Sequence, residues 1–256
     1  MSRHPKPPAR DVSRDTARVH EVEKPAALIA RALAKDYGDG PALHPLDLRV
    51  EEHERVALIG HNGSGKTTFL RMATGLLEPA SGSVTVFGEA PGSMEARRRL
   101  SYLADTPTFY EDLSVWEHLE YTARLHGRSD WEQRAADLLG QLGIYERADD
   151  LPTRFSRGLK QKAAIAMAFI RPFDLMLVDE PFVGLDAEGK EALLELFDEA
   201  SSAGASLVVA THELGFVTTT QRTVALRDGA LIFDGPSSQA EARGLVAVEG
   251  TAETES

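Results

Sequence analysis

An apolar run that ends in a glycine-rich loop constrains the fold of this chain more than any other feature. Residues 56–59 (V-A-L-I) form a short continuous apolar stretch, which is typical of a buried parallel strand. The segment G-H-N-G-S-G-K-T follows directly at residues 60–67. Phe69, Leu70 and Met72 then recur at helical spacing. A glycine loop between a strand and a helix lets backbone N–H groups and the helix N-terminus surround phosphate oxygens. The sequence therefore predicts a phosphate site built on an α/β core.

This loop satisfies the pattern G-x-x-x-x-G-K-[ST], in which individual residues have distinct chemistry. Lys66 reaches the β- and γ-phosphates of a nucleotide, and the Thr67 hydroxyl is a ligand for Mg²⁺. His61 is interpreted as a solvent-exposed filler, with direct nucleotide contact as the alternative. The other candidates for nucleotide contact in or beside the loop are Gly60, Asn62, Gly63, Ser64, Gly65 and Thr68.

A P-loop needs a nearby acidic element that holds the metal and directs water. Residues 175–178 (L-M-L-V) predict a second buried strand, which delivers Asp179 at its end with Glu180 next to it. Asp179 can accept hydrogen bonds from Mg²⁺-bound waters, and Glu180 can orient or deprotonate the attacking water. The alternative is a strand that simply ends in exposed acids, and the presence of the P-loop favours the catalytic interpretation.

Composition excludes several other classes of protein. With 28 Lys and Arg against 40 Asp and Glu, the net charge of −12 argues against a general nucleic-acid binder. The chain contains no cysteine, which excludes disulfides and thiolate metal sites. Residues 1–24 lack the apolar segment of a signal peptide, and the longest apolar run falls far short of the ~20 residues that span a bilayer. We expect a cytoplasmic protein, with a disordered arm at residues 1–25 and an acidic tail at 241–256.

Between these ends, strand patterns alternate with helix patterns. This alternation predicts a mainly parallel sheet with a helical lobe inserted at about residues 105–155. In the lobe, Ser114 and Glu117 have the spacing of a capping box, and Ser129 precedes a second helix that runs through Leu142. Further strands are predicted at residues 46–50, 84–87, 100–103 and 206–210, a helix at 187–201, and a hairpin at 224–233 with Asp228-Gly229 at its turn.

Four further motifs carry a resemblance to a known family. The segment F-S-R-G-L-K-Q at residues 155–161 resembles the signature motif of the ABC-type ATPases, usually LSGGQ, and its Ser156 lies 23 residues before Asp179. V-G-L-D at residues 183–186 resembles the D-loop of that family, and Thr211-His212 resembles its switch histidine. Tyr37 lies where the family has an aromatic that stacks on adenine; the alternative is an aromatic at a strand end that packs on the core.

The resemblance covers about residues 26–240 and implies the fold of the family. This is a P-loop NTPase core with a mainly parallel sheet, an antiparallel β subdomain and the inserted helical lobe. It also implies that two such domains pair head to tail, with each ATP held between one P-loop and the other signature. By this resemblance, Ser156, Gly158 and His212 contact the γ-phosphate, and Asp186 belongs to the nucleotide site. Arg157 and Leu159 differ from the residues that are usual at these two positions of the signature motif. Neither position needs its side chain for the two γ-phosphate contacts of the motif, so both residues are compatible with those contacts.

Asp105 is a second departure from the family pattern. It aligns with the Q-loop, where relatives have Gln or Glu, and its carboxylate is one methylene shorter than that of Glu. A carboxylate oxygen is a suitable Mg²⁺ ligand. We therefore predict a looser metal contact at Asp105, direct or through a water. The alternative is a simple loop residue.

The resemblance implies a function as the ATPase subunit of an ABC transporter. Such a subunit uses ATP and Mg²⁺ to power export through a separate transmembrane permease subunit, pairs with a second ABC ATPase subunit of the same or another kind, and lies on the cytoplasmic face of the membrane. The alternative is a soluble ABC ATPase that acts as a nucleotide-timed switch on the ribosome or DNA. The single cassette, the 90 residues between Lys66 and Ser156, and the negative charge all disfavour this alternative.

Overall fold

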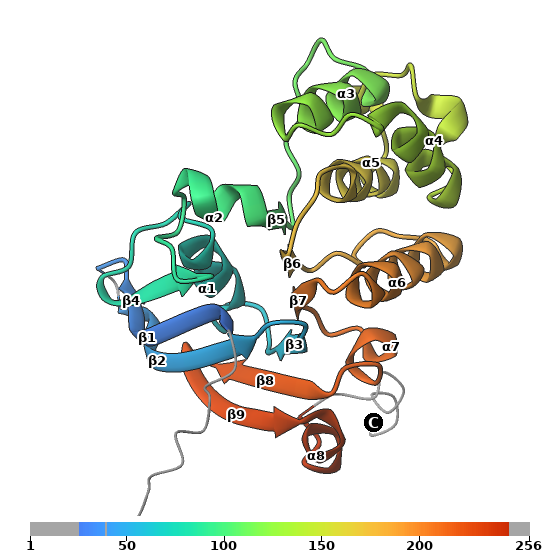
Figure 1. The fold of residues 1–256 in the computed structure, drawn as a ribbon. Coiled ribbons are helices and arrows are strands. Elements are labelled where there is room, and N and C mark those ends of the chain that lie inside the picture. The colour runs from blue at the N-terminus through green and yellow to red at the C-terminus, as the bar shows by residue number, and fades with distance from the viewer. Residues whose placement is uncertain (1–25, 39, 246–256) are drawn as a thin grey trace, which may run out of the picture.

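The computed structural model describes residues 26–38 and 40–245. The predicted arm at residues 1–25 lies outside the described residues, as does most of the predicted tail. The described chain forms two sheets with helices between and around them (Figure 1). This is the mixed α/β architecture that the sequence predicted.

The larger sheet has six strands in the order β5-β6-β7-β3-β8-β9. All neighbouring pairs are parallel except β8 and β9, which form the predicted hairpin. Asp228 and Gly229 at its turn both have positive φ, as a two-residue hairpin turn requires. The strands are β3 (Arg55–Ile59), β5 (Leu100–Leu103), β6 (Leu175–Asp179), β7 (Ser206–Ala210), β8 (Arg222–Arg227) and β9 (Ala230–Pro236).

Alternating side chains of the central strands enter two separate hydrophobic cores. In β3, Val56 and Leu58 pack into one core, whereas Ala57 and Ile59 pack into the other. β6 and β7 divide in the same way. Because side chains of a strand point alternately to its two faces, a strand that is covered on both sides reads as the continuous apolar run seen in the sequence.

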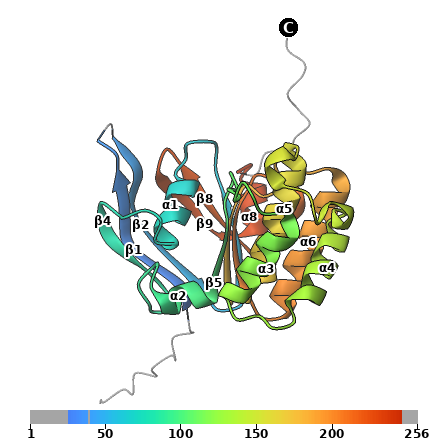
Figure 2. The same cartoon turned by 90° about the horizontal axis from the view of Figure 1, so that it is seen from above.

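The smaller sheet is antiparallel, in the order β2-β1-β4. Its strands are β1 (Ala26–Asp36), β2 (Pro41–Glu51) and β4 (Ser81–Val86). The helix after the P-loop, α1 (Lys66–Ala73), lies between this sheet and the larger one, as the view from above makes clear (Figure 2). The local pattern did not predict β1, because register shifts interrupt its pairing with β2 and its burial does not alternate strictly.

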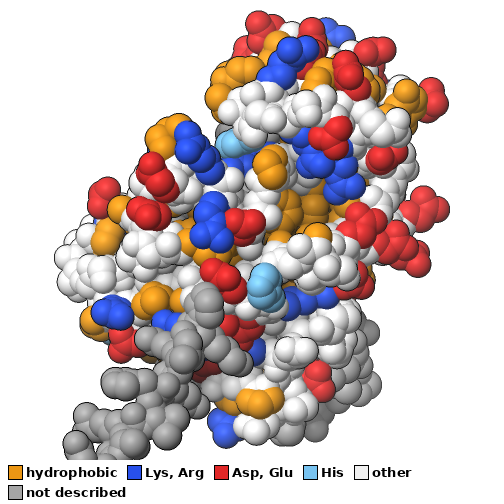
Figure 3. Space-filling model, viewed as in Figure 1, with side chains coloured by type: hydrophobic (Ala, Val, Ile, Leu, Met, Phe, Trp, Pro, Cys, Tyr) orange, Lys and Arg blue, Asp and Glu red, His pale blue; other side chains and the backbone are white. Residues whose placement is uncertain are grey.

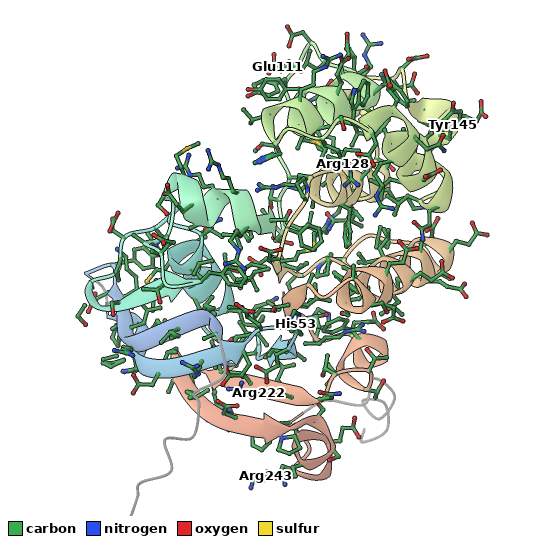
Figure 4. All side chains as sticks on the ribbon, viewed as in Figure 1. His53, Glu111, Arg128, Tyr145, Arg222 and Arg243 are labelled. Carbon is green, nitrogen blue, oxygen red and sulfur yellow. The ribbon has the colours of Figure 1, made fainter. Side chains whose placement is uncertain are left out.

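The helical lobe contains α3 (Val115–Leu125), α4 (Trp131–Gln141) and the short helices η1 (Tyr145–Arg147) and η2 (Pro152–Arg154). Ser114 and Glu117 form the predicted capping box of α3. The cap of α4 is Asp130 rather than Ser129, and the helix ends one residue before Leu142. The signature helix α5 (Arg157–Ile170) packs against both α3 and α4 and so adds to the predicted lobe. Arg128 fastens this contact by donating to the Ile170 carbonyl at 3.2 Å (Figure 4).

The remaining helices are α2 (Met94–Arg99), α6 (Ala187–Ser202), α7 (Leu214–Val217) and α8 (Ser237–Ala242). α8 continues past residue 240, the predicted end of the ATPase domain. Beneath the sheet, the side chains Phe169, Phe182, Phe197 and Phe216 contact one another at ring-centroid distances of 5.3–6.3 Å. This aromatic cluster joins α5, α6 and α7 to the segment that follows Glu180. The packing thereby fixes the position of the end of β6, where Asp179 and Glu180 lie.

Candidate nucleotide-binding site

Two glycines of the loop are required by its geometry. Gly60 has φ +153°, and a Cβ there would lie 2.3 Å from the Leu226 carbonyl oxygen. Gly65, at the entrance of α1, has φ +102°, and its Cβ would lie 2.9 Å from the Ala42 carbonyl oxygen. The loop is thus pressed against neighbouring backbone on two sides, which only glycine permits. The predicted strand–loop–helix arrangement is confirmed.

Lys66 begins α1 and turns its side chain back into the loop. Its Nζ donates to the Gly60 carbonyl at 2.6 Å and lies 3.2 Å from Glu180 Oε1. The ammonium group is therefore held inside the curve of the loop, where a phosphate would have to lie.

A cavity of about 530 Å³ opens over this loop. It brings together ten of the residues predicted from the sequence, which come from the loop, the Q-loop position and the ends of β6 and β7. The residues are Asn62, Gly63, Ser64, Gly65, Lys66, Thr67, Thr68, Asp105, Glu180 and His212. Ala42, Arg157 and Val183 also line the cavity, although they are not among the site residues predicted from the sequence.

Asp179 lies at the end of β6 and is 1% exposed. Neither of its carboxylate oxygens has a hydrogen-bond partner among the described residues. Burial raises the pKa of Asp179, and the nearby carboxylates of Asp105 and Glu180 act in the same direction, whereas the Thr67 hydroxyl and Lys66 oppose it. A buried carboxylate without partners is suited to receive a cation or its bound water.

These donors fit a Mg²⁺–ATP complex better than a metal held by protein alone. Among residues 26–38 and 40–245, no three His, Asp or Glu side chains gather closely enough to hold a metal ion. Mg²⁺ is commonly bound through one or two carboxylates, with substrate phosphates completing its shell. Thr67, Asp105 and Asp179 can supply the protein part of such a shell.

Glu180 lies between the side chains of Lys66 and His212, which come from different parts of the fold. Its Oε1 is 3.2 Å from Lys66 Nζ, and its Oε2 is 3.1 Å from Nδ1 of His212. Its backbone N–H donates to the Ala210 carbonyl at 2.8 Å, and its φ of +46° is unusual for a residue with a side chain. This strained backbone turns the carboxylate out of the sheet and into the cavity, which is the position required of a group that acts on a water.

The signature and D-loop pack against each other at the same edge of the sheet. Ser156 caps α5 by accepting a hydrogen bond from the Leu159 N–H. A Cβ at Gly158 would lie 2.5 Å from the Gly184 carbonyl oxygen, so the two loops are in close contact. Gln161 of α5 donates to the Pro181 carbonyl at 3.0 Å. The signature helix is therefore fastened to the segment that carries Glu180.

Several predicted site residues do not line the cavity. Ser156 and Gly158 are among them, and their contacts with a second subunit remain a prediction. Asp186 caps α6 and pairs with Lys162 at 3.0 Å, which lowers the pKa of Asp186. Tyr37 ends up 59% exposed beyond the end of β1, with Lys35 Nζ 5.4 Å from its ring centre. Stacking of Tyr37 on adenine also remains a prediction.

His61 and Asp105 differ in their relation to the cavity, because Asp105 lines it and His61 does not. His61 Nε2 is 3.1 Å from Asp228 Oδ1, and its side chain is half exposed, in agreement with its interpretation as a solvent-facing filler. Asp105 lines the cavity and lies near enough to Asp179 to influence its pKa. This placement favours the metal-contact hypothesis over that of a simple loop residue.

Comparison with known proteins shows the family to which this chain belongs. A sequence model of the ABC transporter family matches residues 43–183. The chain is 35% identical to the SkfA peptide export ATP-binding protein SkfE of Bacillus subtilis (strain 168), covering 79% of this chain and 86% of that protein. It is 38% identical to the ABC-type transporter ATP-binding protein EcsA of the same organism, covering 73% and 77%. A solved ATP-binding subunit of an ABC transporter superposes with a TM-score of 0.78 at 32% identity, covering 87% of this chain and 95% of that structure.

A P-loop between β3 and α1, with an acidic pair at the end of the parallel strand β6, which β7 separates from β3, defines a P-loop nucleotide triphosphatase. Within that class, the chain belongs to the family of ABC transporter ATP-binding proteins, and it is an ATPase.

Proposed function

We propose that this protein is the ATP-hydrolysing subunit of an ABC exporter and drives a separate transmembrane permease. The observation that carries the proposal is the position of Glu180 between Lys66 and His212 at the mouth of the P-loop cavity. The relative SkfE is described as an ATP-binding protein of peptide export, which favours export as the direction. Within the described residues, no helix is both long enough and apolar enough to cross a bilayer.

ATP supplies the phosphoanhydride bond whose hydrolysis releases energy, and Mg²⁺ neutralises charge on the phosphates. Lys66 binds phosphate oxygens, and Thr67, Asp105 and Asp179 hold the metal or its waters. These assignments agree with the unpartnered, buried carboxylate of Asp179 and with the closed curve of the loop around Lys66.

Glu180 acts as the base or orienting group for the attacking water. Without nucleotide, its two oxygens are occupied by Lys66 and His212. When the several negative charges of a triphosphate enter the cavity, its oxygens attract the Lys66 ammonium and a His212 N–H donor more strongly than the single Glu180 carboxylate does. Their movement toward phosphate releases the Glu180 carboxylate to accept a hydrogen bond from water. His212 thereby senses whether a terminal phosphate is present.

A groove beside the helical lobe supports a permease partner. A second cavity, of about 340 Å³, is bounded by β5 and the residues after it, and by α3 and α5. Phe109 and Met167 give it an apolar wall, and Arg171 adds a positive charge. Ala104 and Thr106, the chain neighbours of Asp105, line this groove. A helix of the permease that docks here would therefore contact the segment that carries Asp105. The protein would then lie on the cytoplasmic face of the membrane.

A second ABC ATPase subunit completes the proposed assembly. Ser156 and Gly158 do not line the cavity of their own chain, which is consistent with contacts to the nucleotide of a paired subunit. The partner is either a second copy of this chain or a related subunit.

The experiment that tests the proposal is purification of the tagged full-length protein from detergent-solubilised membranes. We expect it to copurify with a polytopic membrane protein that stimulates its ATPase activity. Exclusive recovery with ribosomes or DNA would instead support the soluble switch.

The surface charge disfavours this alternative. On the face seen in Figure 3, acidic and basic side chains are interspersed, and the net charge of −12 also disfavours binding of nucleic acid.

A further inference from the structure

Arg157 lines the P-loop cavity of its own chain, although it belongs to the signature motif. Its side chain runs along the D-loop: a Cβ built on Gly184 would lie 3.3 Å from Arg157 Cγ and 3.7 Å from Arg157 Nε. Gly184 has no side chain and so leaves room for this path. The neighbouring Val183 lines the same cavity together with Glu180 and His212.

The interactions within the cavity set Arg157 apart from Lys66 and His212. Lys66 and His212 both pair with Glu180, at 3.2 and 3.1 Å. By contrast, no residue within the described part of the chain forms an ion pair or a hydrogen bond with the Arg157 guanidinium. The cavity therefore holds one cation that is free to meet an incoming anion. A guanidinium is well suited to this, because its fork of N–H donors matches phosphate oxygens and it stays charged at every physiological pH.

We propose that Arg157 binds the terminal phosphate of the ATP held by the P-loop of its own chain. This inference rests on the ATP and Mg²⁺ chemistry proposed for the site. The phosphates next to the ribose are held by the loop itself, around Gly63 and Thr67. Arg157 lines the cavity together with Val183 and with His212, the residue expected to contact the γ-phosphate that ADP lacks.

This contact would connect the signature motif to the nucleotide of its own chain as well as to that of the paired subunit. The neighbours of Arg157, Ser156 and Gly158, are expected to meet the nucleotide of the paired subunit, whereas Arg157 reports on the nucleotide of its own chain. With ATP bound, the start of α5 is drawn toward its own cavity before pairing occurs. With ADP bound, this attraction is absent.

The test is nucleotide affinity of the full-length chain, measured by calorimetry at a concentration where light scattering shows a monomer. The ligands are ADP and the non-hydrolysable ATP analogue AMP-PNP, each with Mg²⁺. For Arg157→Ala we expect about a three- to fivefold loss of AMP-PNP affinity, the size of a partly exposed charge contact. ADP affinity should stay within about twofold, and the AMP-PNP loss should shrink at high salt. Arg157→Lys keeps the charge and should recover most of the affinity.

Arg154→Ala is the matched control, since Arg154 is an exposed arginine three residues earlier that does not line the cavity. It should bind both nucleotides as the wild type does. Unchanged AMP-PNP affinity in monomeric Arg157→Ala, or an equal loss for ADP, would overturn the inference. Lys66→Ala examines the ATP site itself. If wild type and Lys66→Ala bind AMP-PNP equally, the proposed ATP site has failed, which is a different result from a silent Arg157.

Discussion

Asp179→Asn should stabilise the nucleotide-free protein while removing its response to Mg²⁺–ATP. In the structure, both oxygens of the Asp179 carboxylate are buried and without a hydrogen-bond partner among the described residues. Asn keeps the shape of the side chain but has no charge. A buried, unsatisfied charged acceptor costs about 1–3 kcal/mol or more, and the nearby Thr67 hydroxyl and Lys66 offset part of this cost. We expect a net gain of about 1–2 kcal/mol in the free energy of unfolding, or roughly 2–8 °C in Tm for a domain of this size.

The pH dependence of this gain follows from the raised pKa of Asp179. Because the folded state binds the proton more tightly than the unfolded state, stability falls as pH rises from the unfolded pKa of about 3.9 to the folded value. The full cost is present above the folded pKa, and Asn does not incur it. The difference in stability between variant and wild type should therefore grow from about pH 4 upward and level off once the pH exceeds the folded pKa.

Thermal unfolding from pH 5 to 8, with and without Mg²⁺–ATP, measures these effects. A ligand at 100 times its Kd stabilises a protein by about 2.7 kcal/mol, so the wild type should overtake the variant once nucleotide and metal are present. Asp149→Asn is the control, because Asp149 is exposed and the change should be silent. A Tm of Asp179→Asn that equals or falls below that of the wild type without nucleotide would refute the reasoning.

Two further predictions concern carboxylates in the same cavity. Glu180→Gln should retain ATP, lower turnover by about 10² or more, and accumulate an ATP-bound dimer in gel filtration; turnover close to that of the wild type would remove Glu180 from its assigned part in hydrolysis. Asp105→Ala should raise the Mg²⁺ concentration needed for half-maximal ATPase activity, while Asp105→Glu should be nearly silent because it keeps the carboxylate. An unchanged Mg²⁺ titration in Asp105→Ala would mean that this residue is a simple loop residue.

The sequence alone determined the local machinery of this protein. The loop at residues 60–67, the two apolar runs at β3 and β6, the capping box of α3 and the turn at Asp228-Gly229 are each specified by neighbours within a few positions. Such signals are carried by backbone geometry and by the period of burial, which act over short stretches of chain. The predicted first and last residues of α4 each differ from the structure by one position, because neighbouring residues can serve equally well as the cap of a helix.

Only the tertiary structure decided how these parts meet. β3, β6 and β7 are far apart in sequence, yet β7 lies between β3 and β6 in the sheet. This order brings Lys66 to 3.2 Å and His212 to 3.1 Å from the Glu180 carboxylate. The burial of Asp179 and the path of Arg157 over Gly184 likewise depend on packing between distant segments. No local pattern encodes these contacts, because they arise from the crossovers between strands and from the two cores that the central strands share.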